Sequence, residues 1–599
     1  SGLTSVRDNA FRRFSSLTDI TFAVGLTTIG TSAFRGCTCL RSITLQVGLI
    51  SIGKHAFHGC SSLTSINLPV GLTTIGTNAF CGCTSLRSIT LQVGLIALGD
   101  GAFHCCSSLT SINLPVGLTT IGRHTFQGCL FLASVTLPTT LTTIQGWAFE
   151  HCTSLDSVTL PPGLNSIGVR AFFGCNRLAN VALPVGLSSI GRFAFCGCHS
   201  LTSITIPDGV TTIEMCAFGL CTGLLYIELP VGLTRIGEDA FSRCSSLTLI
   251  KFPDALTSIG YGAFAGCKCL LSINLPAGVI YIGRGAFSGC SRVRTIHLPA
   301  GLTTVEARVF SECSRVASIL VPAGIRCIGA GAFRGCSGLC TVTLPAALTS
   351  TGAFAFCECS GLTQINLPDG LTCIGQSTFA DCASLATIML PAGLEILGVC
   401  AFAGCSSLKT IMIPTRIRCI GWETFAKCTN LQTVLLPSAL VSIEYRAFHD
   451  CLNLKTIILP AGLGEVADIA DDVFRRCARL DTVVVLDDSR VSAPADRLIN
   501  QFGGKFSNYA CRADLPLSAQ GMPGVRSVAG VHLWQRWSPP GAAYRHVSAH
   551  RRALEWVVFL VGNRLDSDAG GGLPPEVWAL VLGFVRHDFP ATRKHYLGE

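Results

Sequence analysis

A phenylalanine returns every 23 residues along most of this 599-residue chain. The unit that carries it reads LTSINLPVGLTTIGTNAFCGCTS at residues 63–85, and the interval is kept from Phe11 to Phe448. One more copy, at Phe474, follows a three-residue insertion. A fixed period of this length is typical of solenoids, in which each unit buries its apolar side only against its neighbours. The period therefore predicts one long repeat domain of about 21 coils over residues 1–485.

Each unit contains two short extended segments and a closing turn. In residues 63–68 apolar and polar side chains alternate as LxxIxL before Pro69, which predicts a short strand with its apolar residues inward and its polar residues outward. Residues 71–76, GLTTIG, predict a second short strand. The spacing from Ala79 to Cys83 predicts a helical or 3₁₀ turn that closes the coil, with Phe80 filling its centre.

These residues resemble the BspA-like subclass of leucine-rich repeats. The pattern of that subclass, LxxIxLPxxLxxIGxxAFxxCxx, is matched from Leu3 to about Val485. The resemblance implies a right-handed superhelix of short parallel strands that binds proteins or surfaces and has no catalytic activity of its own. Departures from the pattern are local, and the glycine of the IG pair is replaced by Gln145, Glu214, Glu306 and Glu444.

The high apolar content of the chain raises the question whether it is a membrane protein. The chain is 49% hydrophobic with a mean hydropathy of +0.52, which would suit a membrane protein if the apolar residues were contiguous. The longest apolar runs, such as residues 556–561 and 577–582, fall far short of the roughly 20 residues that a spanning helix needs. We therefore expect no membrane span, and we assign the hydrophobicity to the solenoid core.

The charges do not favour a nucleic-acid partner. The chain has 44 basic and 35 acidic residues, a net charge of +9, and no run of five like charges. Nucleic-acid binding would need cations gathered on one face with aromatic residues among them, and the repeat columns do not supply such a face. We expect a protein partner and no nucleic acid.

A cysteine follows the repeat phenylalanine by three residues in 20 of the 21 coils, from Cys37 to Cys477. The simplest interpretation is a small buried thiol packed in the closing turn. A zinc array is the alternative, but one thiol per coil does not bring four ligands together. Disulfides are disfavoured because Cβ atoms in neighbouring coils would stay near the strand spacing of about 4.8 Å, beyond the mean of about 3.8 Å in disulfides. We expect reduced, buried thiols with no metal and no cofactor.

Reduced thiols favour a reducing compartment, and so a cytoplasmic location. The start of the chain, SGLTSV, has no Met, no basic segment and no apolar segment of a signal peptide, which agrees with that location. A cell-surface location remains open, on condition that the native N-terminus lies upstream of Ser1.

The outward residue between the Ile and Leu of each first strand changes along the chain. It is mostly polar and neutral in the first half, mixed in the central coils, and mostly apolar from Leu320 onward. A contiguous apolar strip on a strand surface usually marks something that covers it. The candidate binding residues are Tyr226, Glu228, Lys251, His297, Leu320, Met389, Met412, Leu435 and Ile458.

The period stops after Val485. Residues 486–547, rich in Gly, Pro, Ser and Arg, predict an irregular linker or cap, and residues 548–599 predict a mainly helical segment with helices at 548–561 and 573–589. In the second helix Leu573, Pro574, Glu576, Val581 and Phe584 resemble the first helix of an F-box, which implies contact with the Skp1-type adaptor of a ubiquitin ligase. The alternative is an amphipathic helix docked on the end of the solenoid.

Repetition argues against an enzyme. A catalytic site needs different groups converging on one point, whereas duplicated coils present the same group many times. The sequence therefore predicts a non-enzymatic protein-binding scaffold that uses the extended strand face. Two alternatives stay open: a cell-surface adhesion or host-contact protein, and an F-box-like substrate adaptor of a ubiquitin ligase.

Overall fold

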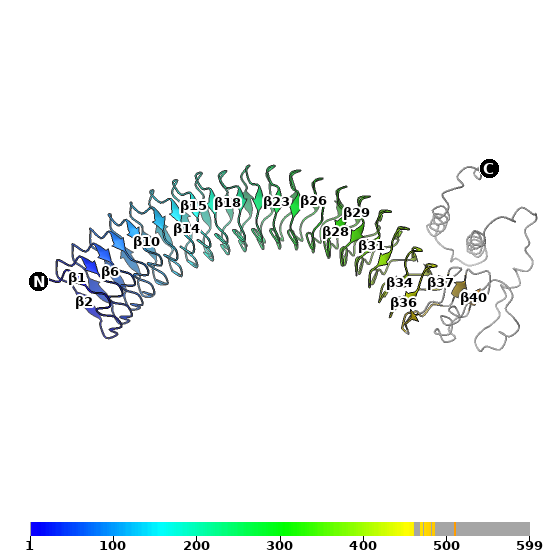
Figure 1. Ribbon diagram of the computed structural model, residues 1–599, viewed down its shortest axis with the longest axis horizontal. Coiled ribbons are helices and arrows are strands. Elements are labelled where there is room, and N and C mark those ends of the chain that lie inside the picture. The colour runs from blue at the N-terminus through cyan, green and yellow to red at the C-terminus, as the bar shows by residue number, and fades with distance from the viewer. Residues whose placement is uncertain (1, 460–467, 471, 481, 486–507, 511–599) are drawn as a thin grey trace, which may run out of the picture. The chain divides into compact units, whose positions relative to one another are not determined.

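The computed structural model describes residues 2–459, 468–470, 472–480, 482–485 and 508–510. The chain divides into two compact units, Ser1–Gly324 and Ile325–Glu599, which are described separately below as unit 1 and unit 2. Together the units hold about 20 coils, and each regular coil contributes two short strands (Figure 1). The predicted parallel-strand solenoid is confirmed.

The LxxIxL segments of unit 1 form its first strands. These are β2 (Asp19–Thr21), β4 (Ser42–Thr44), β6 (Ser65–Asn67), β8 (Ser88–Thr90), β10 (Ser111–Asn113), β12 (Ser134–Thr136), β14 (Ser157–Thr159), β16 (Asn180–Ala182), β18 (Ser203–Thr205), β20 (Tyr226–Glu228), β22 (Leu249–Ile250), β24 (Ser272–Asn274), β26 (Thr295–His297) and β27 (Ser318–Leu320).

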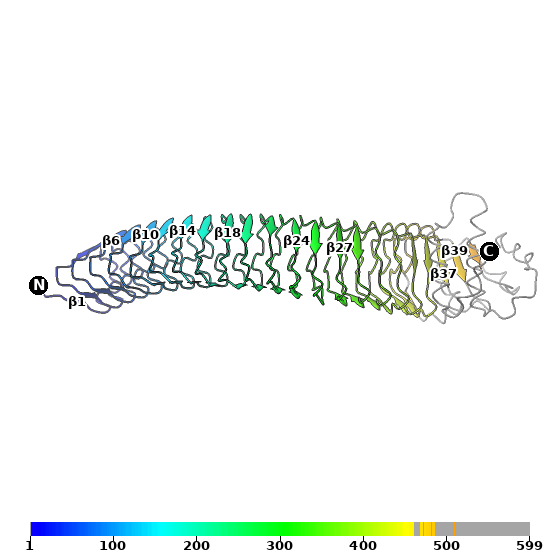
Figure 2. The same ribbon diagram turned by 90° about the horizontal axis from the view of Figure 1, so that it is seen from above.

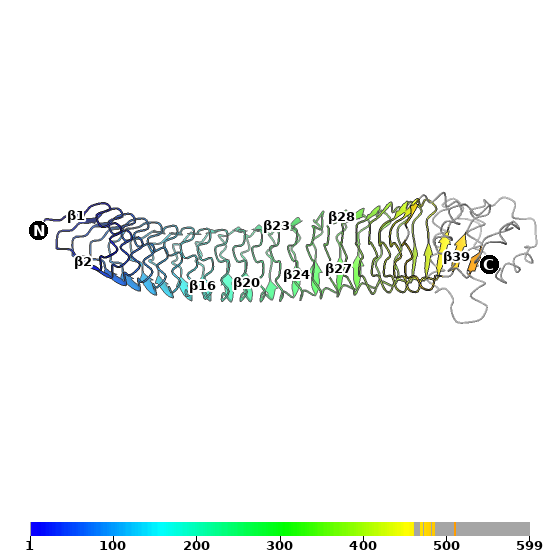
Figure 3. The ribbon, with the colours of Figure 1, turned by 90° about the horizontal axis from the view of Figure 1, so that it is seen from below.

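The GLxxIG segments form the second strands of unit 1. These are β1 (Ser5–Val6), β3 (Thr28–Ile29), β5 (Ser51–Ile52), β7 (Thr74–Ile75), β9 (Ala97–Leu98), β11 (Thr120–Ile121), β13 (Thr143–Ile144), β15 (Ser166–Ile167), β17 (Ser189–Ile190), β19 (Thr212–Ile213), β21 (Arg235–Ile236), β23 (Ser258–Ile259) and β25 (Tyr281–Ile282). Figure 2 shows first strands such as β14, β18 and β24 along one edge, and Figure 3 shows β23 on the edge opposite β20 and β24.

Unit 2 repeats the arrangement with fewer first strands. Its first strands are β29 (Thr341–Thr343), β33 (Thr410–Met412), β35 (Thr433–Leu435), β37 (Thr456–Leu459), β39 (Thr482–Val485) and β40 (Asn508–Ala510), and two coils have only a bridge between Asn366 and Met389. Its second strands are β28 (Cys327–Ile328), β30 (Ser350–Thr351), β31 (Cys373–Ile374), β32 (Ile396–Leu397), β34 (Cys419–Ile420), β36 (Ser442–Ile443) and β38 (Asp468–Ile469).

Strands pair in parallel with a register set by the period. Ser65 pairs with Ser88 and Asn67 with Thr90, so each residue lies beside its counterpart 23 positions later. The side chains follow the predicted alternation, since Ile66 is buried between exposed Ser65 and Asn67. A column of the sequence is therefore also a column on the surface or in the core.

The core of each unit is a stack of phenylalanine rings. Phe264 is fully buried, with ring centroids 5.2 Å from Phe241 and 5.3 Å from Phe287 and nearly parallel ring planes. Offset parallel rings at this separation are a favourable aromatic arrangement. The stack explains why the phenylalanine is the most regular residue of the repeat.

The closing turn is not helical, which corrects the sequence prediction. No described residue is in an α- or 3₁₀-helix. Asn78 and Gly82, two residues before and after Phe80, have φ of 54° and 72°, and left-handed residues interrupt a right-handed helix. The N–H of Phe80 bonds to the Ala102 carbonyl in the next coil, whereas that of Cys81 bonds back to Asn78. Alternate N–H groups thus join neighbouring coils, a pattern that apolar spacing alone does not reveal.

The second glycine of each GLxxIG segment packs directly on the preceding coil. A Cβ added to Gly76 would lie 2.7 Å from the Gly53 carbonyl carbon, closer than real Cβ atoms come. In the coils that carry this glycine, the close stacking leaves no room for a side chain. In a few other coils Gln or Glu replaces the glycine.

Beyond Val485 the structure describes only β40, which pairs in parallel with β39. Residues 508–510 thus add a strand to unit 2 inside the segment predicted as an irregular linker or cap. The predicted helices at 548–561 and 573–589, and with them the F-box-like residues, lie outside the described residues. Over the part of the chain that is described, no helix could span a membrane.

Candidate binding surfaces on the strand faces

The strand face of unit 1 changes character at β20. The outward residues of β18 are Ser203 and Thr205, as in most earlier coils, whereas Tyr226 and Leu249 are 51% and 54% exposed at the next two positions of the same column. Leu225 and Leu271, on the adjoining column, are also exposed. With Glu228 and Lys251 these side chains form what we call the central patch, which comprises Leu225, Tyr226, Glu228, Leu249, Lys251 and Leu271.

Three members of the central patch, Leu225, Leu249 and Leu271, are not among the candidate residues predicted from the sequence. Leu225 and Leu271 occupy a column where other coils carry Thr64, Thr110 or Arg294, so the change to leucine was the signal. This column directly follows a column of inward leucines. An occasional leucine in it therefore does not stand out from the repeat pattern. The structure shows both side chains at the surface.

The charges of the central patch are exposed neighbours. Glu228 accepts a hydrogen bond from the Thr205 hydroxyl at 3.3 Å, and Lys251 lies one coil further on. Among the described residues these two side chains form no ion pair with each other. His297 lies outside the patch on β26, where its Nδ1 is 2.8 Å from the Asn274 Oδ1. The patch therefore offers one acidic and one basic group beside an apolar surface.

In unit 2 the same outward column is apolar over four successive coils. Met389 is 63% exposed, and Met412, Leu435 and Ile458 are half-buried. Met412 pairs with Leu435 and Leu435 with Ile458, so the side chains are adjacent. We call these four residues the apolar strip. The predicted site residues thus fall into two groups, with Tyr226, Glu228, Lys251, His297 and Leu320 in unit 1 and the strip in unit 2.

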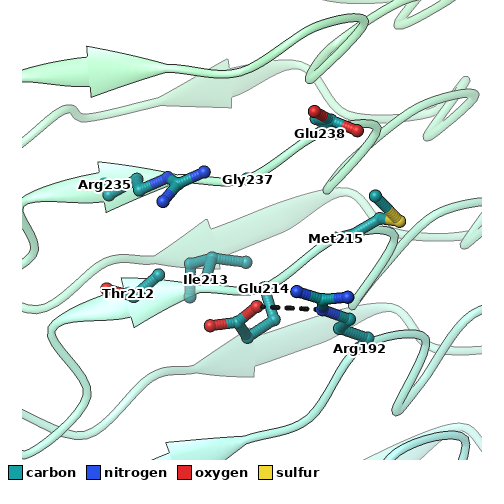
Figure 4. Close-up of a pocket in the computed structure, with 8 residues that line it drawn as sticks. All are labelled: Arg192, Thr212, Ile213, Glu214, Met215, Arg235, Gly237 and Glu238. Carbon is teal, nitrogen blue, oxygen red and sulfur yellow. Dashed lines mark ion pairs between the residues drawn. The ribbon is translucent and has the colours of Figure 1, made fainter.

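A small pocket opens on the second-strand side of unit 1 where Glu214 replaces the packing glycine (Figure 4). Glu214 points toward Arg192 of the preceding coil, with 3.6 Å between its Oε2 and the arginine Nε. Arg235 and Glu238 of the following coil also line the pocket. Its volume of about 100 Å³ is well below the roughly 300 Å³ of a typical small-molecule site, and both ion-pair partners are substantially exposed. We interpret it as a local gap in the stacking.

The turns of unit 1 bring together titratable groups that the sequence did not link. His104 has its Nδ1 3.4 Å from the Cys81 Sγ and its Nε2 3.4 Å from the Cys105 Sγ. Burial lowers the pKa of His104 and raises the pKa of Cys81 to about 11. The two thiols contact different nitrogens of one ring, so the three side chains do not converge on one ion. Within the described part of the chain, no three His, Cys, Asp or Glu side chains could hold a metal ion.

The column thiols are buried, as predicted, except for Cys477, which is half-buried. The Cys60 Sγ donates a hydrogen bond to the Phe34 carbonyl at 3.2 Å. Desolvation by burial raises the pKa of Cys60 to about 12, so the nucleophilic thiolate is scarce at neutral pH. These thiols are packing groups and do not form a reactive site.

Six overlapping matches to the model of the BspA-type leucine-rich repeat region together cover residues 4–481, at residues 4–130, 73–191, 119–248, 168–275, 258–382 and 349–481. The chain belongs to this family. The BspA-type pattern accounts for the coils of both units, and the resemblance deduced from the repeat is confirmed. A comparison with curated proteins gave no match.

Several solved structures are similar to this BspA-type chain. A leucine-rich repeat protein from Bacteroides ovatus is 27% identical, over 74% of this chain and 89% of that protein, with a TM-score of 0.38. A leucine-rich cell surface protein from Faecalibacterium prausnitzii is 23% identical over 58% and 86% of the two chains, with a TM-score of 0.30. The pneumococcal vaccine antigen PcpA is 18% identical over 64% and 89%, with a TM-score of 0.37.

Proposed function

We propose that this BspA-type protein is a non-enzymatic scaffold that binds a protein partner through the strand face, with the central patch of unit 1 as the contact that determines specificity. The observation that carries the proposal is the exposure of Tyr226 and Leu249 side by side, where the repeat places serine. Protein interfaces are enriched in exposed tyrosine at their energetic centre. Leu225 and Leu271 extend the apolar area, and Glu228 and Lys251 supply polar groups at its margin.

The repeat itself supports a binding role over a catalytic one. The flanking strands present Ser203 and Thr205 on one side of the patch and Ser272 and Asn274 on the other, and these groups do not form a set of acid, base and nucleophile. The central patch departs from that surface by being apolar and aromatic, which suits association with a protein better than catalysis. Scaffolds of stacked repeats use such extended faces for partners.

We also propose a cytoplasmic location, because a long column of buried cysteines suits a reducing compartment. Secretion with these thiols intact would count against it. The F-box-like residues of the alternative function, at 573–589, lie outside the described residues. The binding role proposed for the central patch does not depend on them. Surface attachment, the other alternative, would be consistent with the same central patch.

The proposal is tested by affinity capture with the full chain and quantitative mass spectrometry. Tyr226→Ser combined with Leu249→Ser restores the residues that stand at Ser203 and Ser272 in the flanking coils, so the fold should be retained. We expect at least one captured protein to be lost with this variant and kept with the control Ser111→Ala combined with Asn113→Ala. A capture profile identical for both variants would refute the role of the central patch.

A further inference from the structure

The apolar strip of unit 2 is regular in a way that the central patch is not. Met389, Met412, Leu435 and Ile458 present one apolar side chain per coil over four successive coils. The preceding coils of the unit carry exposed Thr343 and Asn366 at the same column. The strip therefore has a defined beginning and a fixed repeat distance.

The repeat distance along the strip determines which secondary structure can lie on it with one side chain per coil. The core rings beneath it are 5.4 Å apart from Phe379 to Phe402, 5.6 Å from Phe402 to Phe425 and 5.3 Å from Phe425 to Phe448. At the strand face the spacing of parallel strands is about 4.8 Å. An α-helix rises 5.4 Å per turn, so a helix lying across the strands meets each coil with about one turn.

An extended segment does not fit the strip in the same way. Its side chains on one face repeat at about 6.6 Å, so over three intervals it would run about 20 Å against roughly 14 to 17 Å for the coils. Three turns of helix span about 16 Å. The strip thus matches an amphipathic helix with apolar residues at i, i+4, i+7 and i+11. The flexible side chains of Met389 and Met412 can absorb the small difference in spacing.

Positive charge lies beside one flank of such a helix. Lys409 and Lys455 are exposed at the beginning of two strand segments beside the strip, with Gln432 between them. The four strand segments 386–390, 409–413, 432–436 and 455–459 contain no Asp or Glu. A ligand helix is therefore favoured if it carries acidic residues on the flank that faces the lysines.

We propose that the apolar strip binds an amphipathic α-helix of a protein partner, aliphatic toward the strip and acidic toward Lys409 and Lys455. The inference rests on the proposed function only in that the chain is a binding protein, because it uses another surface in another unit. It adds a second site and names the secondary structure and charge of the ligand.

The experiment measures fluorescence anisotropy of labelled synthetic peptides with the full chain. One peptide is an alanine-based helix with leucine at i, i+4, i+7 and i+11 and glutamate on one flank; the second has lysine in place of the glutamate, and the third is a scramble of the first. We expect the glutamate peptide to bind, with the lysine peptide weaker by about tenfold because it repels Lys409 and Lys455. Equal binding by the scrambled peptide would overturn the proposal. So would a lack of binding by the glutamate peptide, which is also the result expected if this chain's own C-terminal segment covers the strip.

Matched variants locate the binding. Leu435→Glu places a charge in the middle of the strip and should weaken binding by about tenfold or more, whereas Thr343→Glu, on the same column outside the strip, should not. Leu435→Thr introduces the residue found at Thr343 and should also weaken peptide binding. It serves as the test variant if Leu435→Glu does not fold. The pair Lys409→Glu and Lys455→Glu should reverse the preference toward the lysine peptide. Unchanged peptide binding in all these variants would overturn the proposal.

The two proposals fail separately. Tyr226→Ser combined with Leu249→Ser should leave peptide binding unchanged, and Leu435→Glu should leave the capture attributed to the central patch unchanged. Loss of peptide binding in the Tyr226 and Leu249 variant would place the helix site on unit 1 and contradict the assignment to the strip.

Discussion

The thiol of Cys83 donates a hydrogen bond of 3.2 Å to the main-chain carbonyl oxygen of Phe57, 26 residues earlier. The same oxygen accepts the N–H of Cys60 within its own coil. The cysteine column therefore ties each turn to the coil before it and satisfies a buried acceptor that packing alone would leave with one partner. This contact gives the regularity of the cysteine a reason beyond its size.

Removing one of these thiols should have a measurable cost. Cys83→Ala deletes a buried hydrogen bond and leaves a small void, so we expect a loss of about 1–2 kcal/mol of stability. Urea unfolding of the full chain would measure it. Cys39→Ala, at an exposed cysteine off the column, is the control and should change stability little. Equal effects would show that the hydrogen bond does not stabilise the stack.

Thiol reactivity should separate the column from the surface. Burial raises the pKa of Cys83 and of Cys267, and their side chains are inaccessible in the folded chain. We expect a thiol reagent at neutral pH to modify Cys39 quickly and both column thiols only after denaturation, with peptide mass spectrometry identifying the sites. Rapid modification of Cys83 in the folded protein would contradict the burial.

The core and outward columns should differ in tolerance. Phe264→Ala removes a fully buried ring that stacks on both sides and should cost about 3–5 kcal/mol. Asn113→Ala removes an exposed amide that accepts one hydrogen bond from Thr136, and should change stability by about 0.5 kcal/mol or less. Thermal melts of both variants provide the comparison, and equal shifts would mean that the inward and outward assignment is wrong.

The packing glycines make a further prediction. Gly76→Ala places a Cβ 2.7 Å from the carbonyl carbon of Gly53, and separating the two coils should cost roughly 1–3 kcal/mol. Gly232→Ala is the control, because its nearest atom would be 3.9 Å away, and it should be neutral or slightly stabilising. Chemical unfolding would compare them. If neither variant changed the free energy of unfolding, the close contact between coils would not be the reason that glycine occupies this position of the repeat.

Mild acid should weaken the turns around His104. Its folded-state pKa is lowered from the ordinary 6.5, first by burial and then by His124, so the unfolded chain takes up a proton more readily than the folded chain. Stability is therefore complete above about pH 6.5 and falls as the pH drops below that value. Melting temperatures at pH 7.5 and 5.5 should show a smaller decrease for His104→Gln, which copies Gln127 of the next coil. A decrease of the same size would exclude His104 as a contributor.

Much of the architecture could be predicted because the repeat averages over many coils. The strand positions, the inward Ile66 and the buried thiols follow from columns that recur about 20 times. The closing turn was mispredicted because apolar spacing does not report the sign of φ at Asn78, and inter-coil hydrogen bonds from Phe80 replaced those of a helix. Non-glycine residues such as Trp147, with φ of 59°, gave no sequence signal of a left-handed turn.

The candidate surfaces were less predictable than the fold. Tyr226 could be identified from the sequence, and the structure places it in register with Leu249 of the next coil. Leu225 and Leu271 could not, since leucine in a leucine-rich repeat is expected in the core. The contact of His104 with Cys81 and Cys105 depends on the distance between neighbouring turns. That distance cannot be deduced from the residues that recur at one position of the repeat.

Two tyrosines allow a direct test of the claim that the strand face binds the partner. Tyr226 lies on the first-strand face and is 51% exposed, whereas Tyr281 lies on a second strand and is 48% exposed. A photo-cross-linking phenylalanine analogue at either position of the full chain, followed by irradiation in an extract of the source cells and mass spectrometry, compares the two faces with matched side chains. We expect a discrete cross-linked product from position 226 and none from position 281. A product from position 281 alone, or the same product from both positions, would exclude the first-strand face as the specific binding surface.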